Sequence, residues 1–237
     1  MQIEVIIEKK SHKLDAEEGK TILETLQEHG IHVLTAPCGG RGRCGKCTVE
    51  VEHMGEVLAC MTKVTDGMRI TIPEVQLRAQ KSKIAENGTV THYPADDGEG
   101  LDAACDIGTT TVVCHLIDGK TGEKLATVSE PSAQRSFGAD VLSRIQAAEA
   151  GKLEILKEQI IFQIAQMLRT LQKKTGRGEQ IQRLAVVGNT VMCHLFAGIS
   201  PVSIGVTPFM PQEFFGKEYT GEQLGLTDCR SVYIAPA

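Results

Sequence analysis

Four cysteines constrain the fold of this chain more than any other feature, because three of them fall within ten residues. That stretch reads Cys38-Gly-Gly-Arg-Gly-Arg-Cys44-Gly-Lys-Cys47, and Cys60 follows twelve residues later. Four thiolates on two irons hold a [2Fe-2S] cluster, and glycines let the backbone of such a loop come close to it. The sequence therefore predicts a [2Fe-2S] cluster bound by Cys38, Cys44, Cys47 and Cys60.

The spacing of these cysteines is C-x5-C-x2-C. It differs by one residue from the C-x4-C-x2-C of plant-type ferredoxins and resembles the vertebrate-type and bacterial ferredoxins instead. Arg41, Arg43 and Lys46 add cationic side chains to the loop. They would favour the reduced cluster and guide an acidic partner, or they form an ordinary solvated surface.

Three other interpretations of the loop are possible. A structural zinc site usually has two short C-x2-4-C pairs, and this stretch has one, Cys44 and Cys47. Disulfides are disfavoured because no apolar signal segment follows Met1, so a reducing compartment is expected. The letters Gly40-x4-Gly45-Lys46 approach a phosphate-binding P-loop, but Cys47 stands where that motif needs Ser or Thr.

The residues around the cysteines predict a β-grasp ferredoxin domain over 1–76. Alternating apolar residues predict a first strand from Ile3 to Ile7, with a hairpin partner over 11–16. Thr21 and Glu24 form a capping box that would open a short helix, and Gly30 would end it. Three further strands are expected at residues 49–51, 57–60 and 68–72, giving an α+β domain.

Composition excludes several classes of function. No apolar run approaches the roughly 18 residues of a membrane span, so we expect a cytoplasmic protein without membrane contact. The net charge of -5 and the absence of tryptophan argue against nucleic acid as a partner. A polar and glycine-rich stretch over 77–100 predicts a linker, and residues 101–237 would form a second domain.

The second domain begins with a strand that ends at Asp106 and turns through Gly108 to three threonines, Thr109, Thr110 and Thr111. Glycine would let the backbone approach an anion, the threonine amides and hydroxyls would hold phosphate oxygens, and Asp106 would hold magnesium. An ordinary hairpin with a polar turn is the alternative. A later strand, over 184–187, ends at Gly188 and Asn189, which would either face the nucleotide or shape a turn.

These segments resemble a known family. The run Asp106-Ile-Gly-Thr-Thr-Thr resembles the first phosphate motif of the superfamily of acetate and sugar kinases, heat-shock chaperone ATPases and actin. The segments 130–145 and 187–195 resemble one branch of it, the reductive activators of corrinoid proteins. Members of this branch join an N-terminal [2Fe-2S] ferredoxin to such an ATPase, in the order found here.

The resemblance implies an α/β RNase H-like lobe of the actin type over 101–237, and an ATP-dependent one-electron donor. Such an activator would return the Co(II) corrinoid of a methyltransferase system to Co(I), with ATP and Mg²⁺ as further cofactors. Its partners would be the corrinoid protein or methyltransferase and an upstream electron donor, and a homodimer is left open. The second phosphate motif and the adenosine motif are not visible, so we expect the lobe to be incomplete at Ala237.

A second function remains open from the residues themselves. The chain would then be a simple [2Fe-2S] electron carrier, with a docking or dimerisation lobe that catalyses nothing. No Ser-His-Asp or Cys-His arrangement predicts a nucleophile, and no side chain is assigned a catalytic role. The dispersed cysteines and histidines of the second domain are expected to be structural: Cys105, Cys114, Cys193, Cys229, His115 and His194.

Overall fold

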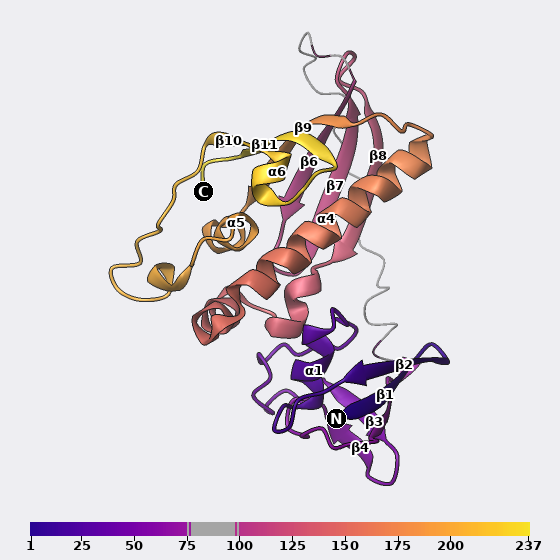
Figure 1. Ribbon diagram of the computed structural model, residues 1–237. Helices are drawn as coiled ribbons and strands as arrows, with labels where there is room; N and C mark the ends of the chain where they lie inside the picture. The colour runs from indigo at the N-terminus through magenta and orange to yellow at the C-terminus, as the bar shows by residue number, and fades with distance from the viewer. Residues whose placement is uncertain (75, 77–97, 99) are drawn as a thin grey trace. The chain divides into compact units, whose positions relative to one another are not determined.

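The computed structural model describes residues 1–74, 76, 98 and 100–237. They form two compact units, each with its own sheet (Figure 1). The described part of unit 1 is residues 1–74, 76 and 133–147, and that of unit 2 is residues 98, 100–132 and 148–237. The predicted linker lies outside the described residues, except for Gly98 and Gly100. Within the described ranges, no helix has both the length and the hydropathy of a membrane span.

Unit 1 contains a five-stranded mixed sheet in the order β2-β1-β5-β3-β4. Its strands are β1 (Gln2–Ile7), β2 (Lys10–Asp15), β3 (Thr48–Val51), β4 (Gly55–Leu58) and β5 (Arg69–Thr71). β1 is antiparallel to β2 and parallel to β5, and β3 is antiparallel to both of its neighbours. The order of elements along the chain is the predicted one. The strand predicted over 57–60 corresponds to β4, which ends at Leu58. It ends there because the amides of Met61 and Thr62 both donate to the Leu58 carbonyl.

The helix α1 (Ile22–Glu28) forms where its capping box predicts it. The hydroxyl of Thr21 accepts the amide of Glu24, and the Glu24 carboxylate accepts the amide of Thr21. Both bonds satisfy helix-end donors that would otherwise lack partners. Ile22 and Leu26 are fully buried and anchor the helix in the apolar core of the unit.

Residues 133–147 also belong to unit 1, although in the chain they lie between two parts of unit 2. They form η1 (Ala133–Phe137) and α3 (Val141–Ala147). The Arg144 side chain is fully buried and donates to the Gly138 carbonyl, at 3.3 Å, and to Gln134 Oε1, at 3.4 Å. These bonds fix the short helix η1 to α3.

Unit 2 contains a six-stranded mixed sheet in the order β10-β11-β9-β6-β7-β8. The strands are β6 (Leu101–Ile107), β7 (Thr111–Asp118), β8 (Lys124–Pro131), β9 (Ile181–Gly188), β10 (Lys217–Thr220) and β11 (Cys229–Ile234). β6, β9 and β11 run parallel, β7 is antiparallel to β6 and β8, and β10 is antiparallel to β11. The carboxyl ends of the three parallel strands therefore meet at one edge, where ligands of open α/β sheets usually bind.

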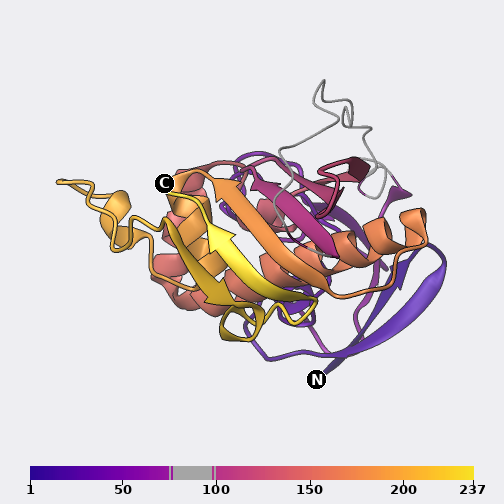
Figure 2. The same cartoon turned by 90° about the horizontal axis from the view of Figure 1, so that it is seen from above.

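Helices α4 (Leu153–Thr175) and α5 (Thr190–Ala197) cover one face of this sheet (Figures 1 and 2). Apolar residues recur along α4 at helical spacing and are buried, with Leu156, Ile160, Ile164, Met167 and Leu171 all inaccessible to solvent. The π-helix η2 (Ala148–Lys152) precedes α4, and Gly151 breaks its regularity with a φ of 83°. The short elements η3 (Val202–Ile204) and α6 (Gly221–Leu224) complete the unit.

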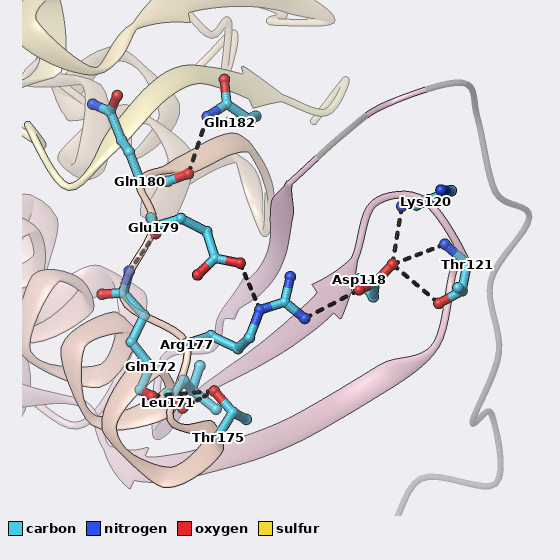
Figure 3. Close-up of polar contacts among 10 residues, drawn as sticks. All are labelled: Asp118, Lys120, Thr121, Leu171, Gln172, Thr175, Arg177, Glu179, Gln180 and Gln182. Carbon is cyan, nitrogen blue, oxygen red and sulfur yellow. Dashed lines mark hydrogen bonds and ion pairs between the residues drawn. The ribbon is translucent and has the colours of Figure 1, made fainter.

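Arg177 links the end of α4 to the turn between β7 and β8, at one end of the unit 2 sheet (Figure 3). It follows Gly176, the left-handed residue that ends α4, and its guanidinium contacts both Asp118 and Glu179. Asp118 also accepts the amides of Lys120 and Thr121, which shapes the turn between β7 and β8. This network joins the end of α4 to that turn, at the opposite end of β6 and β9 from Gly108 and Asn189.

Candidate functional site

Two of the four cysteines are brought together by the β3–β4 hairpin. Cys47 directly precedes β3 and Cys60 follows β4 by one residue. Thr48 pairs with Leu58, and the Ala59 amide donates to the Cys47 carbonyl at 2.9 Å. The two cysteines are buried, whereas Cys38 and Cys44 of the preceding loop are only half-buried.

Contacts between the thiols link Cys60 to Cys47, and Cys38 to Cys44. Burial, with a hydrogen bond that the Cys60 thiol donates to Cys47, raises the pKa of Cys60 to about 12. Burial also acts to raise the pKa of Cys38, but hydrogen bonds from the Cys44 amide and side chain and from the amides of Arg43 and Arg41 outweigh it, so this pKa falls to about 6. Cys38 therefore pairs with Cys44, and Cys47 with Cys60. Amides aimed at one sulfur are the hydrogen bonds that stabilise a bound thiolate.

This arrangement fits a binuclear cluster. The loop is built on glycine: Gly39, Gly40, Gly42 and Gly45 all have positive φ. At Gly42 a side chain would also collide, because a Cβ there would lie 2.7 Å from the Met61 sulfur. Two pairs of thiols on this loop and hairpin suit the two irons of such a cluster.

Other residues of unit 1 fix the position of the cluster loop. The Gln76 side chain is buried and donates to the Lys46 carbonyl at 2.6 Å, next to Cys47. On the other side of the loop, the Ala139 amide donates to the Pro37 carbonyl at 3.2 Å, next to Cys38. No local pattern in the sequence predicts either contact.

The segment 133–147 makes further contacts with the helix and loop of unit 1. The buried Gln27 side chain donates to the Ser136 carbonyl at 2.9 Å. The Phe137 ring is buried and lies 6.4 Å from the His32 ring, centroid to centroid. Burial lowers the pKa of His32 to about 4, so this histidine is neutral near pH 7. The segment thus packs against the residues that carry the cysteine loop.

In unit 2, the structure brings the two predicted phosphate-binding segments together. β6 and β9 lie side by side and parallel, with Ile107 paired to Gly188. Directly beyond this pair, Asn189 Nδ2 donates to Thr109 Oγ1 at 3.1 Å. These residues are 80 positions apart in sequence, so their contact is an outcome of the fold. Asn189 also caps α5, because its Oδ1 accepts the Met192 amide at 3.0 Å.

Asp106 lies at the same edge of the sheet, next to Val187 of β9, and is exposed. Partial desolvation raises its pKa above that of an ordinary aspartate. Thr110 is exposed as well, and its carbonyl accepts the Ser132 amide at 2.9 Å. Threonine hydroxyls, a carboxylate and a helix N-terminus at one sheet edge can together bind a phosphate and its cation.

The two glycines of this edge are required by the fold. A Cβ on Gly108 would lie 2.4 Å from the Thr111 carbonyl oxygen, and one on Gly188 would lie 3.0 Å from the Ile107 carbonyl oxygen. Contact within the hairpin and between the strands thus disfavours a side chain at both positions, in addition to the anion approach that the sequence suggests for Gly108.

For the remaining cysteines and histidines of unit 2, burial and internal hydrogen bonds are consistent with the structural roles expected of them. Cys105, Cys114, Cys193 and Cys229 are all buried. His194 is also buried, and it donates through Nδ1 to the Thr190 carbonyl and accepts the Glu213 amide at Nε2.

Comparison with known proteins identifies both parts of the chain. Residues 4–74 match the family described as "2Fe-2S iron-sulfur cluster binding domain", and residues 101–237 match "RACo middle region". The chain is 27% identical to the "Corrinoid activation enzyme RamQ" of Eubacterium limosum, over 75% of this chain and 43% of that protein. A solved structure described as "Reductive activator for corrinoid,iron-sulfur protein" is 22% identical and superposes with a TM-score of 0.55, over 99% of this chain and 55% of the other.

The chain thus spans about half the length of these two relatives. Unit 1 has the predicted ferredoxin-like fold, and unit 2 is a second domain with a mixed sheet. Since the match over 101–237 includes more than half of the chain, the protein belongs to the RACo middle region family and carries a 2Fe-2S iron-sulfur cluster binding domain before that region.

Proposed function

We propose that this protein is an iron–sulfur electron-transfer protein that serves as an ATP-dependent reductive activator, returning the Co(II) corrinoid of a methyltransferase system to Co(I). The observation that carries the proposal is the presence, in one chain, of two thiol pairs and of the Thr109–Asn189 contact at the edge of a second sheet. The two relatives described above are named for corrinoid activation, which supports the same function for this chain.

In the proposed cluster site, Cys38 and Cys44 hold one iron, and Cys47 and Cys60 hold the other. When bound, a cluster of this kind supplies a one-electron couple, which lies near roughly -400 mV in plant-type ferredoxins. The protein contributes the amides of Arg41, Arg43 and Cys44, which stabilise the Cys38 thiolate. It also buries Cys47 and Cys60 and so keeps water from that side of the site.

In the proposed nucleotide site, Thr109, Thr110 and Thr111 hold phosphate oxygens through amides and hydroxyls, on a turn shaped by Gly108. Asn189, after Gly188, orients Thr109, and Asp106 holds the hydration shell of Mg²⁺. Sheet order supports an RNase H-like lobe of the actin type. In β8-β7-β6-β9-β11, the first three strands form a meander and the last two continue parallel to β6. Bound Mg-ATP supplies binding and hydrolysis energy.

ATP is needed in this proposal because electron transfer from the cluster to the Co(II) corrinoid is thermodynamically unfavourable. Each ~59 mV of unfavourable difference in potential lowers the equilibrium constant of a one-electron transfer tenfold. A gap of ~120 mV would therefore require that the nucleotide bind the productive complex about a hundredfold more tightly than the unproductive one. The proposed partners are a corrinoid protein and an upstream electron donor, in the cytoplasm, with a homodimer as one form of the activator.

The test uses the chain with its cluster reconstituted under anaerobic conditions. It is mixed with a chemical reductant and a Co(II) corrinoid protein of a methyltransferase system, and Co(I) is followed by absorbance with and without Mg-ATP. Faster formation of Co(I) with Mg-ATP is expected. Equal rates would make the chain a simple electron carrier with a docking lobe, and no Co(I) in either case would refute both functions.

A further inference from the structure

The cysteine loop has a charge opposite to that of the rest of its domain. Residues 37–47 contain three cationic side chains and no carboxylate. The other residues of 1–74 contain 6 Lys and Arg but 12 Asp and Glu. Because the whole chain has a net charge of -5, the loop is a positive region on a negative protein.

The three cations, Arg41, Arg43 and Lys46, are all exposed. Within the described part of the chain, no ion pair involves them, whereas Lys20 and Arg69 of the same unit are paired with glutamates. An unpaired cation on a surface keeps its charge available to a partner.

The same loop carries the more exposed thiol pair. Cys38 and Cys44 are half-buried, and Cys47 and Cys60 are buried. Met61, beside Gly42, leaves 62% of its surface in water. Unpaired cations with one exposed apolar side chain among them are typical of a surface that meets a protein partner transiently, with charge guiding the encounter.

From these observations we infer that Arg41, Arg43, Lys46 and Met61 form a docking surface for an acidic patch on the redox partner of the protein. The inference rests on the cluster assignment of the proposed function. A cluster held by four thiolates is anionic and would repel carboxylates. The three cations offset that repulsion at the edge where Cys38 and Cys44 are most accessible, so an acidic partner can come close enough to exchange an electron.

The first test compares two small oxidants of opposite charge, the monoanion Co(III)-EDTA and the trication hexaamminecobalt(III). Each accepts one electron from the reduced cluster and becomes Co(II). Stopped-flow measurements at low ionic strength would compare the wild type with the double variant Arg41→Glu/Arg43→Glu. The control, Lys9→Glu/Lys10→Glu, makes the same change in net charge on exposed residues of the β1–β2 turn.

A unit charge at ~10 Å in water changes the rate of encounter with a singly charged reagent about twofold. Reversing both arginines should thus slow oxidation by Co(III)-EDTA on the order of tenfold relative to the control and accelerate oxidation by hexaamminecobalt(III), and both effects should shrink at high salt. If the double Glu variant does not assemble its cluster, Arg41→Gln/Arg43→Gln should show the same changes at about half the size on a logarithmic scale.

A second readout does not depend on electron transfer. Binding of a fluorescently labelled decaglutamate peptide, measured by anisotropy, should be weakened by the Arg41→Glu/Arg43→Glu variant and not by the control. Two results would overturn the inference: equal effects of the variant and the control on the ratio of the two oxidation rates, or changes of both rates in the same direction. The latter would mean that the cations only alter the potential of the cluster. Neither result depends on ATP or on a corrinoid, so the proposed function can fail separately.

Discussion

Asn189 has two separate contacts, so its replacement yields a quantitative prediction. Its Oδ1 caps α5 by accepting the Met192 amide, at 3.0 Å, and its Nδ2 donates to Thr109, at 3.1 Å. Loss of a cap costs about 1 kcal/mol, and loss of a hydrogen bond between neutral groups costs about the same. Asn189→Ala should therefore destabilise the first turn of α5 by about 2 kcal/mol. Asn189→Ser, which still caps but is too short to reach Thr109, should cost about 1 kcal/mol.

Hydrogen–deuterium exchange of the Met192 amide measures this local stability directly. A loss of about 2 kcal/mol corresponds to roughly thirtyfold faster exchange, and 1 kcal/mol to roughly fivefold. Thr220→Ala is the matched control, because Thr220 caps α6 of the same unit in the same way. The reasoning is wrong if Asn189→Ala leaves exchange unchanged. Equal acceleration by the Ala and Ser variants would show that the contact with Thr109 contributes nothing.

Three further predictions concern other parts of the structure. Cys60→Ser should lower the iron content well below the roughly two irons per chain of an intact cluster, measured by iron analysis after anaerobic purification, whereas Cys105→Ser, in unit 2, should retain both. Gly108→Ala should destabilise unit 2 by about 1–3 kcal/mol, because its Cβ would lie 2.4 Å from the Thr111 carbonyl oxygen; thermal unfolding at the wild-type midpoint would contradict this. The pKa of His32 falls from 6.5 to about 4 on burial, so between these values the unfolded chain binds more protons and stability should fall as pH is lowered. His32→Gln should weaken that pH dependence in denaturant titrations, and an unchanged dependence would rule out His32 as a cause.

Local chemistry explains what could be predicted from the sequence. The capping box at Thr21 and Glu24 is complete within four residues, so it needs no other part of the chain to form. Strand alternation at Ile3 and Val5 and the apolar stripe of α4 are likewise local patterns. The spacing of the cysteines is also a local pattern, and the prediction of the cluster rests on it.

Contacts between distant residues could not be predicted, because no local pattern encodes them. Gln27 and Ser136 are 109 positions apart, and neither residue type favours such a contact. β10 was missed as well: Lys217–Thr220 has no apolar alternation and forms a strand because it pairs with β11 at the edge of the sheet. Residues 138–152 do not form one regular helix either. The positive φ of Gly138 precedes α3, and that of Gly151 interrupts η2.

The nucleotide segments illustrate both cases. Asp106, Gly108 and Asn189 could be selected because they follow apolar strands and precede turns. The sequence left open whether Asn189 serves a nucleotide or a turn, and in the structure it caps α5 and also reaches Thr109. That second contact depends on the parallel register of β6 and β9, which only the folded sheet defines.

Electron paramagnetic resonance of freeze-quenched samples tests the central claim most directly, because it observes the reduced cluster and the Co(II) corrinoid in one experiment. The chain, reduced without excess reductant, would be mixed with a Co(II) corrinoid protein in the presence and absence of Mg-ATP. The account predicts that one Co(II) signal is lost for each reduced-cluster signal lost, and that Mg-ATP accelerates both losses equally. A Co(II) signal that persists with Mg-ATP, while the cluster remains reduced, would contradict it.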